Sequence, residues 1–238
     1  MTDNELRIVL AARLASVHAR IDVACARVNR NPAGVTLVAV TKTVTPRVAK
    51  SAAELGVLDL GESRPQELWR KAEALNDLPI RWHLVGHLQR NKVERALPLV
   101  HLIHSVDSLR LLQTIADEGR KRNIRPRVLL QVNASHEEQK HGFDEDELAR
   151  AEPEVTGTPV DVLGLMTMAA YSEDSELARP AFVVLRKLRD RLRSEWSLTS
   201  TQLEHLSMGM SGDFEVAVEE GATIVRIGTT LFEGLENE

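Results

Sequence analysis

Apolar residues near the start of the chain recur at the spacing of a helix. From Asn4 to Arg30 the sequence contains no glycine or proline, so no residue in it breaks a helix. Steps of three and four separate the apolar positions, which places their side chains on one face. These positions are Leu10, Leu14, Val17, Ile21, Ala24 and Val28. We therefore predict a long amphipathic helix within residues 1–30, ended by the sequence NRNPAG.

After residue 34 the pattern changes to short apolar runs that alternate with helix-like segments such as PRVAKSAAEL. Eight strands that alternate with helices are typical of a (β/α)8 barrel, the TIM barrel. The alternative is a doubly wound open sheet, which usually has fewer strands. We predict the α/β barrel, with strands at residues 36–41, 57–61, 81–86, 101–105, 127–133, 161–167, 203–207 and 223–228.

The last predicted strand lacks a full helix after it. Only TTLFEGLENE follows, so we expect the N-terminal helix of residues 1–30 to pack on the barrel and cover this gap. No internal repeat, linker or low-complexity segment appears, and we place residues 1–238 in one domain. The polar stretch 133–157 is read as a loop with a short helix.

Composition and charge exclude several classes of protein. With 43% apolar and 27% charged residues the chain is not disordered, and its net charge of −5 comes without the clustered basic face that nucleic-acid binding needs. No apolar run approaches the roughly 18 residues of a membrane span. The start, MTDNELRIVL, does not resemble a secretory signal, and a single cysteine suits a reducing compartment. We therefore expect a cytoplasmic protein.

Two loops near the end of the chain suit a phosphate. SMGMSGD (207–213) follows the seventh predicted strand and RIGTT (226–230) ends the eighth, where TIM barrels frequently bind phosphate at a helix start. Their glycines would let the backbone approach closely, and Ser207, Ser211 and Thr229 would add hydroxyl donors. The alternative for SMGMSGD is an ordinary loop with an N-cap serine. Two such loops at the two expected positions favour a phosphate site.

Lys42 is the first charged residue after the apolar run LVAVT. The ordinary alternative is a solvated surface lysine. A lysine at the mouth of a barrel, near a phosphate site, instead suggests a Schiff base with an aldehyde. Pyridoxal 5'-phosphate (PLP) combines an aldehyde with a phosphate, so we predict PLP as a cofactor held covalently on Lys42.

Arg226 shares the inward face of the last predicted strand with Ile224 and Gly228. A buried arginine needs a partner, and a pyridine nitrogen would suit this permanent donor. The alternative is an internal ion pair with Asp59 or Glu62.

Histidines and methionines complete the candidates. The pairs His83/His87 and His101/His104 do not match a metal motif, so we predict no metal site. Core packing or pocket lining is expected for the methionines Met166, Met168, Met208 and Met210.

Eight segments of the chain, in order, resemble the family of pyridoxal-phosphate-binding homeostasis proteins, which is itself similar to the barrel domain of alanine racemase standing alone. The segments are AVTKTVTP, LGESRPQEL, RWHLVGHLQRNK, IHSVDS, VLLQVN, KHGF, GLMTM and LSMGMSGDFEVAVEEGATIVRIGTTLF. The resemblance implies that Lys42 forms the Schiff base and that Arg226 faces the pyridine nitrogen. It further implies that the cofactor site includes Ser63, His83, Met166, Ser207, Ser211, Gly228 and Thr229.

Two departures from the family pattern affect the pocket. Ser63 replaces the asparagine of Gly-Glu-Asn, which removes an amide contact with the cofactor. His87 and Arg90 replace the proline and the serine of Gly-Pro-Leu-Gln-Ser-Asn-Lys and would alter the mouth of the pocket.

The resemblance also bears on function. Racemases of the related fold take a second base, a tyrosine, from a separate domain, whereas this chain has one tyrosine, Tyr171, and no evident second base. We therefore predict a monomer or weak dimer that holds PLP for homeostasis without catalysis and delivers it to PLP-dependent apo-enzymes. The alternatives are a low-activity PLP-dependent racemase or lyase, and a phosphosugar enzyme without a cofactor.

Overall fold

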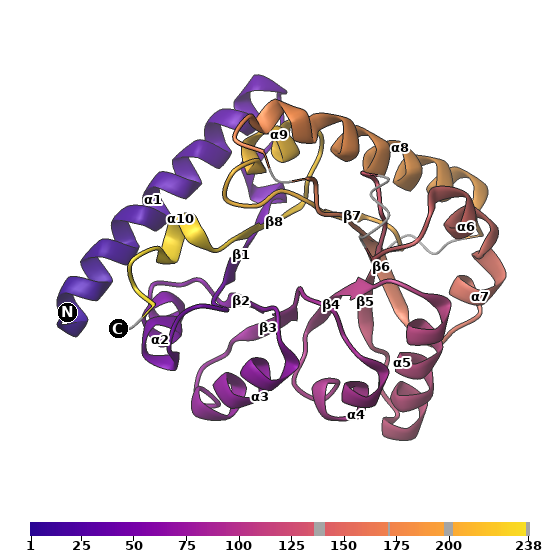
Figure 1. Ribbon diagram of the computed structural model, residues 1–238, viewed down its shortest axis with the longest axis horizontal. Coiled ribbons are helices and arrows are strands. Elements are labelled where there is room, and N and C mark those ends of the chain that lie inside the picture. Colours follow the sequence, from indigo (N-terminus) through magenta and orange to yellow (C-terminus); the bar gives the residue numbers. More distant parts are fainter. Residues whose placement is uncertain (136–140, 171, 198–201, 237–238) are drawn as a thin grey trace.

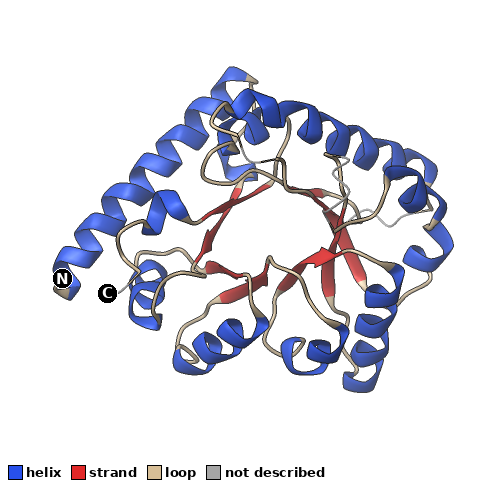
Figure 2. Ribbon diagram, viewed as in Figure 1, coloured by secondary structure: helices blue, strands red, loops and turns tan. Residues whose placement is uncertain are grey.

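A closed barrel of parallel strands forms the centre of the molecule, and helices surround it (Figures 1 and 2). The computed structural model describes residues 1–135, 141–170, 172–197 and 202–236. The strands follow one another around the barrel in chain order, and the eighth pairs with the first. The predicted TIM barrel with an N-terminal helix is therefore confirmed.

Each predicted strand overlaps an observed one. The strands are β1 (Thr36–Val40), β2 (Asp59–Glu62), β3 (Arg81–Leu84), β4 (Leu102–Val106), β5 (Arg127–Gln131), β6 (Asp161–Met166), β7 (His205–Ser207) and β8 (Ile224–Ile227). Most are shorter than predicted, although backbone hydrogen bonds continue for one residue past several of them, as from the Thr41 N–H to the Gly61 carbonyl at 2.9 Å after β1.

The helices lie outside the barrel and pack their apolar faces on it. They are α1 (Asp3–Arg27), α2 (Pro46–Glu54), α3 (Pro65–Ala74), α4 (Val93–Ala96), α5 (Leu109–Arg122), α6 (Glu145–Arg150), α7 (Glu152–Thr156), α8 (Arg179–Glu195), α9 (Phe214–Glu219) and α10 (Thr229–Phe232), with 3-10 turns at Pro32–Gly34, Arg90–Lys92 and Ser175–Ala178. The stretch 133–157 was predicted as a loop with a short helix; its described part, which leaves out residues 136–140, contains two short helices, α6 and α7. Within the described residues, no helix combines the length and apolar character needed to cross a membrane.

Helix α1 occupies the place left by the short α10. Thr2 and Glu5 form a capping box at its start, because each side chain accepts a hydrogen bond from the other's backbone N–H. Its buried face packs on α2, α9 and α10. Val28 does not belong to this face, since the helix ends at Arg27 and the Val28 side chain is exposed.

The barrel interior has an apolar part and a polar part. The apolar cluster consists of Val38, Leu102, Leu129, Met166 and Ile224. Polar side chains from β2, β3, β4, β7 and β8 fill the rest, and they include the buried Arg226. Since β1 pairs with β8 at Val38↔Arg226, the inward positions of the two strands lie side by side. This register brings the ends of β1 and β8 to the same mouth.

Candidate functional site

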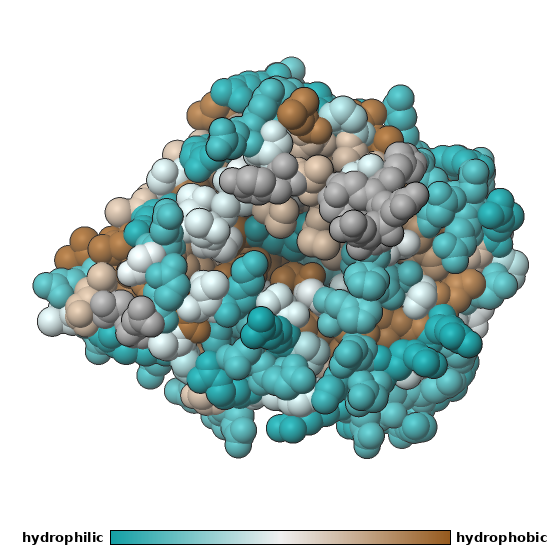
Figure 3. All heavy atoms as spheres, in the orientation of Figure 1, coloured by the Kyte–Doolittle hydropathy of each residue, from teal (hydrophilic) through white to brown (hydrophobic). Residues whose placement is uncertain are grey.

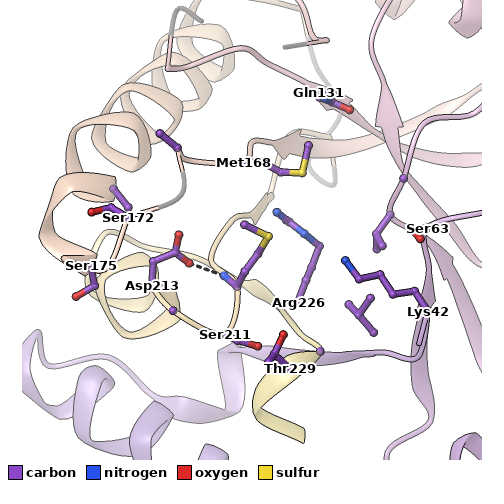
Figure 4. Close-up of a pocket in the computed structure, with 18 of the residues that line it drawn as sticks. Lys42, Ser63, Gln131, Met168, Ser172, Ser175, Ser211, Asp213, Arg226 and Thr229 are labelled. Carbon is purple, nitrogen blue, oxygen red and sulfur yellow. Dashed lines mark hydrogen bonds between the residues drawn. The ribbon is translucent and has the colours of Figure 1, made fainter. Parts of the chain in front are cut away.

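A cavity of about 370 Å³ opens at the carboxyl ends of the strands. The space-filling view shows the face that carries it, hollowed near the barrel axis (Figure 3). Six of the predicted site residues line this cavity: Lys42, Ser63, Ser211, Arg226, Gly228 and Thr229. The fold thus brings an amine, a guanidinium and several hydroxyl groups from separate strand ends into one space (Figure 4).

Lys42 extends into the cavity from the end of β1 (Figure 4). The preceding residue is held firmly: the Thr41 carbonyl accepts a hydrogen bond from Lys71 Nζ at 2.5 Å, and Thr41 Oγ1 lies 2.6 Å from Glu62 Oε1. Lys71 Nζ also pairs with Glu62 Oε1 at 2.6 Å, and both side chains are buried. The Lys42 ammonium, by contrast, has no hydrogen-bond or ion-pair partner among the described residues. Its base is therefore fixed while its amine is available.

Arg226 projects from β8 towards the floor of the cavity and is almost fully buried. Nη1 donates to Ser207 Oγ at 2.6 Å, and Nη2 donates to the Thr167 carbonyl at 2.9 Å. Burial lowers the pKa of Arg226 to about 10, an effect that the charge of Asp213 opposes. The guanidinium therefore remains a cation at neutral pH, and its orientation is set by two acceptors.

The alternative that Arg226 pairs with Asp59 or Glu62 is wrong. Asp59 Oδ2 lies 2.5 Å from Arg81 Nη2, and Glu62 pairs with Lys71. Arg226 instead donates to Ser207 and to the Thr167 carbonyl, and the charge of Asp213 opposes the lowering of its pKa.

A chain of hydrogen bonds continues from Ser207 across the barrel interior. Ser207 Oγ lies 2.8 Å from His104 Nδ1, and His104 Nε2 lies 2.9 Å from His83 Nδ1. His83 Nε2 in turn lies 2.9 Å from Asp59 Oδ1. A carboxylate only accepts hydrogen bonds and an arginine only donates them. With both imidazoles neutral, each group can therefore donate only to the next one, in the order Arg226, Ser207, His104, His83 and Asp59. We call these five side chains the interior chain.

The pKa of His104 supports the neutral form of its ring. Complete burial lowers this pKa well below the ordinary value, and the positive charge of Arg226 acts in the same direction. In the folded protein His104 therefore accepts from Ser207 and donates to His83 without carrying a charge.

Stability is expected to fall as the pH drops below about 6.5, the ordinary pKa of histidine. In this range the unfolded chain takes up a proton on His104 that the folded chain does not, so the free energy of unfolding decreases by up to about 1.4 kcal/mol per pH unit. Burial also lowers the pKa values of His101 and His205, which add to the slope. Urea titrations of the wild type and of His104→Gln at several pH values measure the share of His104. Identical slopes would contradict this account.

The loops after β7 and β8 are tied to each other. Ser211 Oγ accepts a hydrogen bond from the Thr230 N–H at 3.2 Å. Asp213 Oδ1 accepts from the Met210 N–H at 2.6 Å, which closes the first loop on itself (Figure 4). Gly209 has a φ of 92°, and a Cβ there would lie 2.5 Å from the Cβ of Ala217, so only glycine fits this turn.

Three predicted site residues do not line the cavity. His83 and Ser207 lie beneath it, where their polar atoms belong to the interior chain, and Met166 is part of the apolar cluster of the barrel. All three point inward, as the period of the strand predicts, but each occupies a layer below the rim. His83, which the resemblance placed in the pocket lining, is not among the residues that line the cavity; its hydrogen bonds lead there through His104, Ser207 and Arg226.

Sequence reasoning missed one side of the cavity. Residues from the segment between β6 and α8 line it, among them Met168, Ser172, Asp174 and Ser175. Met168 had been placed only in a general group of core or lining methionines. The remaining signal in this segment, a run of small and polar residues after a strand, is common to many surface loops.

Comparisons with known proteins agree with this geometry. The family model described as "Alanine racemase, N-terminal domain" matches residues 13–236. The pyridoxal phosphate homeostasis protein of Aquifex aeolicus is 46% identical over 221 residues, covering 92% of this chain and 96% of the relative. The corresponding protein of Pseudomonas aeruginosa is 37% identical and covers 94% of each chain.

Solved structures show the same relationship. PipY of Synechococcus elongatus, determined with PLP bound, superposes with a TM-score of 0.83 at 33% identity, covering 94% of this chain and 99% of PipY. A structure described as "an unknown protein from Bifidobacterium adolescentis" superposes with a TM-score of 0.90 at 36% identity, with 98% of each chain covered. The resemblance inferred from the eight motifs is thereby confirmed. Matched over nearly its whole length, the chain belongs to the alanine racemase N-terminal domain family, within the group of pyridoxal phosphate homeostasis proteins.

Proposed function

We propose that this protein binds PLP in the cavity at the barrel mouth and serves PLP homeostasis. The observation that carries the proposal is the Lys42 ammonium, which has no partner among the residues that the structure describes and shares the cavity with a buried guanidinium and the hydroxyls of Ser211 and Thr229. Small-molecule pockets typically measure about 300–1,000 Å³, and the cavity of about 370 Å³ is within this range. The names of the relatives and the PLP in PipY support the same cofactor.

Lys42 is the residue that would attach the cofactor. Its amine adds to the aldehyde carbon, a carbon–nitrogen double bond forms, and one water molecule leaves; addition of water reverses the bond. Anchoring of Thr41 by Lys71 and Glu62 would hold the amine near one position of the aldehyde. Reversible attachment of this kind suits storage and delivery, including delivery to PLP-dependent apo-enzymes by a cytoplasmic monomer or weak dimer.

The phosphate would lie against the loops after β7 and β8. Ser211 Oγ already accepts from Thr230, so its own hydrogen is available for an acceptor such as a phosphate oxygen. Asp213 is also close to these loops, but burial raises the pKa of its carboxyl, against the opposing effects of the Met210 N–H and of Arg226.

Arg226 would face the pyridine nitrogen and keep it unprotonated, because a guanidinium donates a hydrogen bond without giving up its proton. An unprotonated ring withdraws electrons less strongly, which disfavours amino-acid chemistry. Racemisation also needs a second proton-transfer group on the opposite face. Tyr171, the single tyrosine, lies outside the described residues, so the preference for binding rests on Arg226. We therefore place binding ahead of catalysis.

Titration of the protein with PLP and with pyridoxal, which lacks the phosphate, tests the proposal. We expect tighter binding of PLP, and the double variant Ser211→Ala/Thr229→Val should weaken PLP binding at least about tenfold, because a hydrogen bond to a charged group contributes about 1.5–3 kcal/mol. Pyridoxal binding should not change, and the control Ser172→Ala, on the other side of the cavity, should behave as wild type. The PLP-loaded protein should also show no sustained alanine racemisation. Equal affinities for PLP and pyridoxal would contradict the phosphate site, and steady turnover would favour the racemase alternative.

A further inference from the structure

Three loops place metal-ligating side chains together beside the cavity. His87 follows β3, Asp107 follows β4, and His141 lies after β5. One ligand atom from each of these residues lies within 4.8 Å of the other two. His87 Nδ1 is 3.0 Å from Asp107 Oδ2, and the two imidazole rings are stacked with centroids 4.8 Å apart. We call these residues the rim cluster.

We propose that the rim cluster binds a divalent transition metal, with Zn²⁺ as the best match. Two imidazoles and one carboxylate form a ligand set that Zn²⁺, Co²⁺ and Ni²⁺ accept, whereas Ca²⁺ and Mg²⁺ prefer oxygen ligands. Zinc–ligand bonds of about 2.0–2.2 Å place tetrahedral ligand atoms roughly 3.3–3.6 Å apart. The His87 and Asp107 ligand atoms, 3.0 Å apart, are slightly closer than this spacing, and the ligand atoms of all three residues lie within 4.8 Å, so small rotations of the side chains would complete the site.

The surroundings of the rim cluster hold its backbone and its carboxylate in place. Ser108 Oγ lies 3.2 Å from Asp107 Oδ1, the oxygen that His87 does not contact, as expected for a side chain that orients a ligand. Gln131 Nε2 donates to the His141 carbonyl at 2.9 Å, and Phe143 forms an isolated β-bridge with Val132, the residue after β5. Ser105 Oγ donates to the carbonyl of Gly86 at 2.6 Å, which fixes the residue before His87.

The remaining features of the rim cluster leave room for a metal ion. The His141 ring has no hydrogen bond among the described residues, so its nitrogens are available. The His87 side chain is 47% exposed, which gives an ion access from solvent. His87 and His141 also line the cavity that contains Lys42. Three protein ligands leave a fourth position open, and here it would face that cavity and could accept a carboxylate or hydroxyl group of an incoming molecule.

One ligand of the rim cluster is a residue at which this chain departs from the family motif. His87 replaces the proline of the family motif, and proline cannot ligate a metal. Linear spacing between histidines predicted no metal site, because the three ligands come from loops that are adjacent only in the folded barrel.

Titration of the tag-free full-length protein with Co²⁺ and with Zn²⁺ tests the proposal. We expect one Co²⁺ per chain with visible ligand-field bands, and competition with a chromophoric chelator gives the Zn²⁺ affinity. His87→Pro, which restores the family residue, and His141→Ala should each lower the Zn²⁺ affinity at least about tenfold. The control His18→Ala, which removes an exposed histidine of α1, should leave it unchanged.

The outcomes separate this site from the PLP site. Lys42→Ala removes the proposed attachment point of PLP but none of the metal ligands, so it should bind Zn²⁺ as the wild type does. Wild-type affinity in both His87→Pro and His141→Ala would overturn the proposal. An equal loss of affinity in His18→Ala would overturn it as well, because it would show binding to scattered surface histidines.

Discussion

Lys42→Ala is expected to abolish covalent binding of PLP completely. The wild-type protein loaded with PLP should absorb near the visible edge, and borohydride should bleach this band and fix the cofactor to the chain. The carbon–nitrogen bond requires a primary amine within reach of the aldehyde, and Lys42 supplies an amine that lines the cavity and has no partner in the described part of the chain. Absorbance spectra and the mass of the reduced protein measure the effect.

Two further variants separate the bond from the charge. Lys42→Arg keeps a cation at the strand end but cannot form the bond, so it should retain noncovalent PLP and resist fixation by borohydride. Lys50→Ala removes an exposed lysine of α2 and should behave as wild type. If borohydride still fixed PLP to Lys42→Ala with wild-type yield, another amine would be the attachment point.

Lys71→Met is expected to destabilise the protein by about 3–5 kcal/mol, the usual cost of removing one partner of a buried ion pair. The side chains of Lys71 and Glu62 are 1% and 0% exposed, so solvent cannot compensate the carboxylate that remains. Glu62 Oε2 already has no hydrogen-bond partner within the described part of the chain. The same variant would also release the Thr41 carbonyl and loosen the residue that positions Lys42.

Urea unfolding of four proteins tests this pair. Lys50→Met, at an exposed position of α2, is the control and should change the stability by less than about 0.5 kcal/mol. Lys71→Met/Glu62→Leu removes both charges and should recover much of the loss, because apolar pairs often replace buried ion pairs without cost. A loss below about 1 kcal/mol in Lys71→Met would show that the pair is not needed for stability.

Much of the fold was predictable because the barrel repeats a simple pattern. Short runs of β-branched and aliphatic residues, such as LVAV in β1, are too short to form the apolar face of a helix but have the length of a buried strand. They therefore predict the strands reliably. The N-terminal helix was equally clear, because its apolar positions follow the helical period over many turns. The residues at which strands end were predicted less accurately, because the hydrophobic pattern does not show where the hydrogen bonding between strands stops.

The site was predictable only in part. The positions of Lys42 and Arg226 at strand ends predict that their side chains lie near the mouth of the barrel. The sequence does not show how deep in the barrel an inward side chain lies. His83, Ser207 and Met166 were therefore predicted to lie at the cavity, and the structure places them below it. The sequence also did not show which charged side chains form ion pairs. Glu62 was considered as a partner of Arg226, but it pairs with Lys71. Contacts between loops, such as those of the rim cluster, depend on the closed order of the strands and leave no signal in any short segment.

Through the interior chain, residues that do not line the cavity influence the hydrogen bonds available to a molecule bound in it. Asp59, at the start of β2, lies at the opposite end of the barrel from the mouth, yet its carboxylate determines which nitrogen of His83 carries hydrogen and, through His104, which way the Ser207 hydroxyl turns. A survey of related proteins that scored only contact residues would treat an exchange at this aspartate as silent. Asp59 nonetheless determines which groups donate and which accept hydrogen bonds below the cavity.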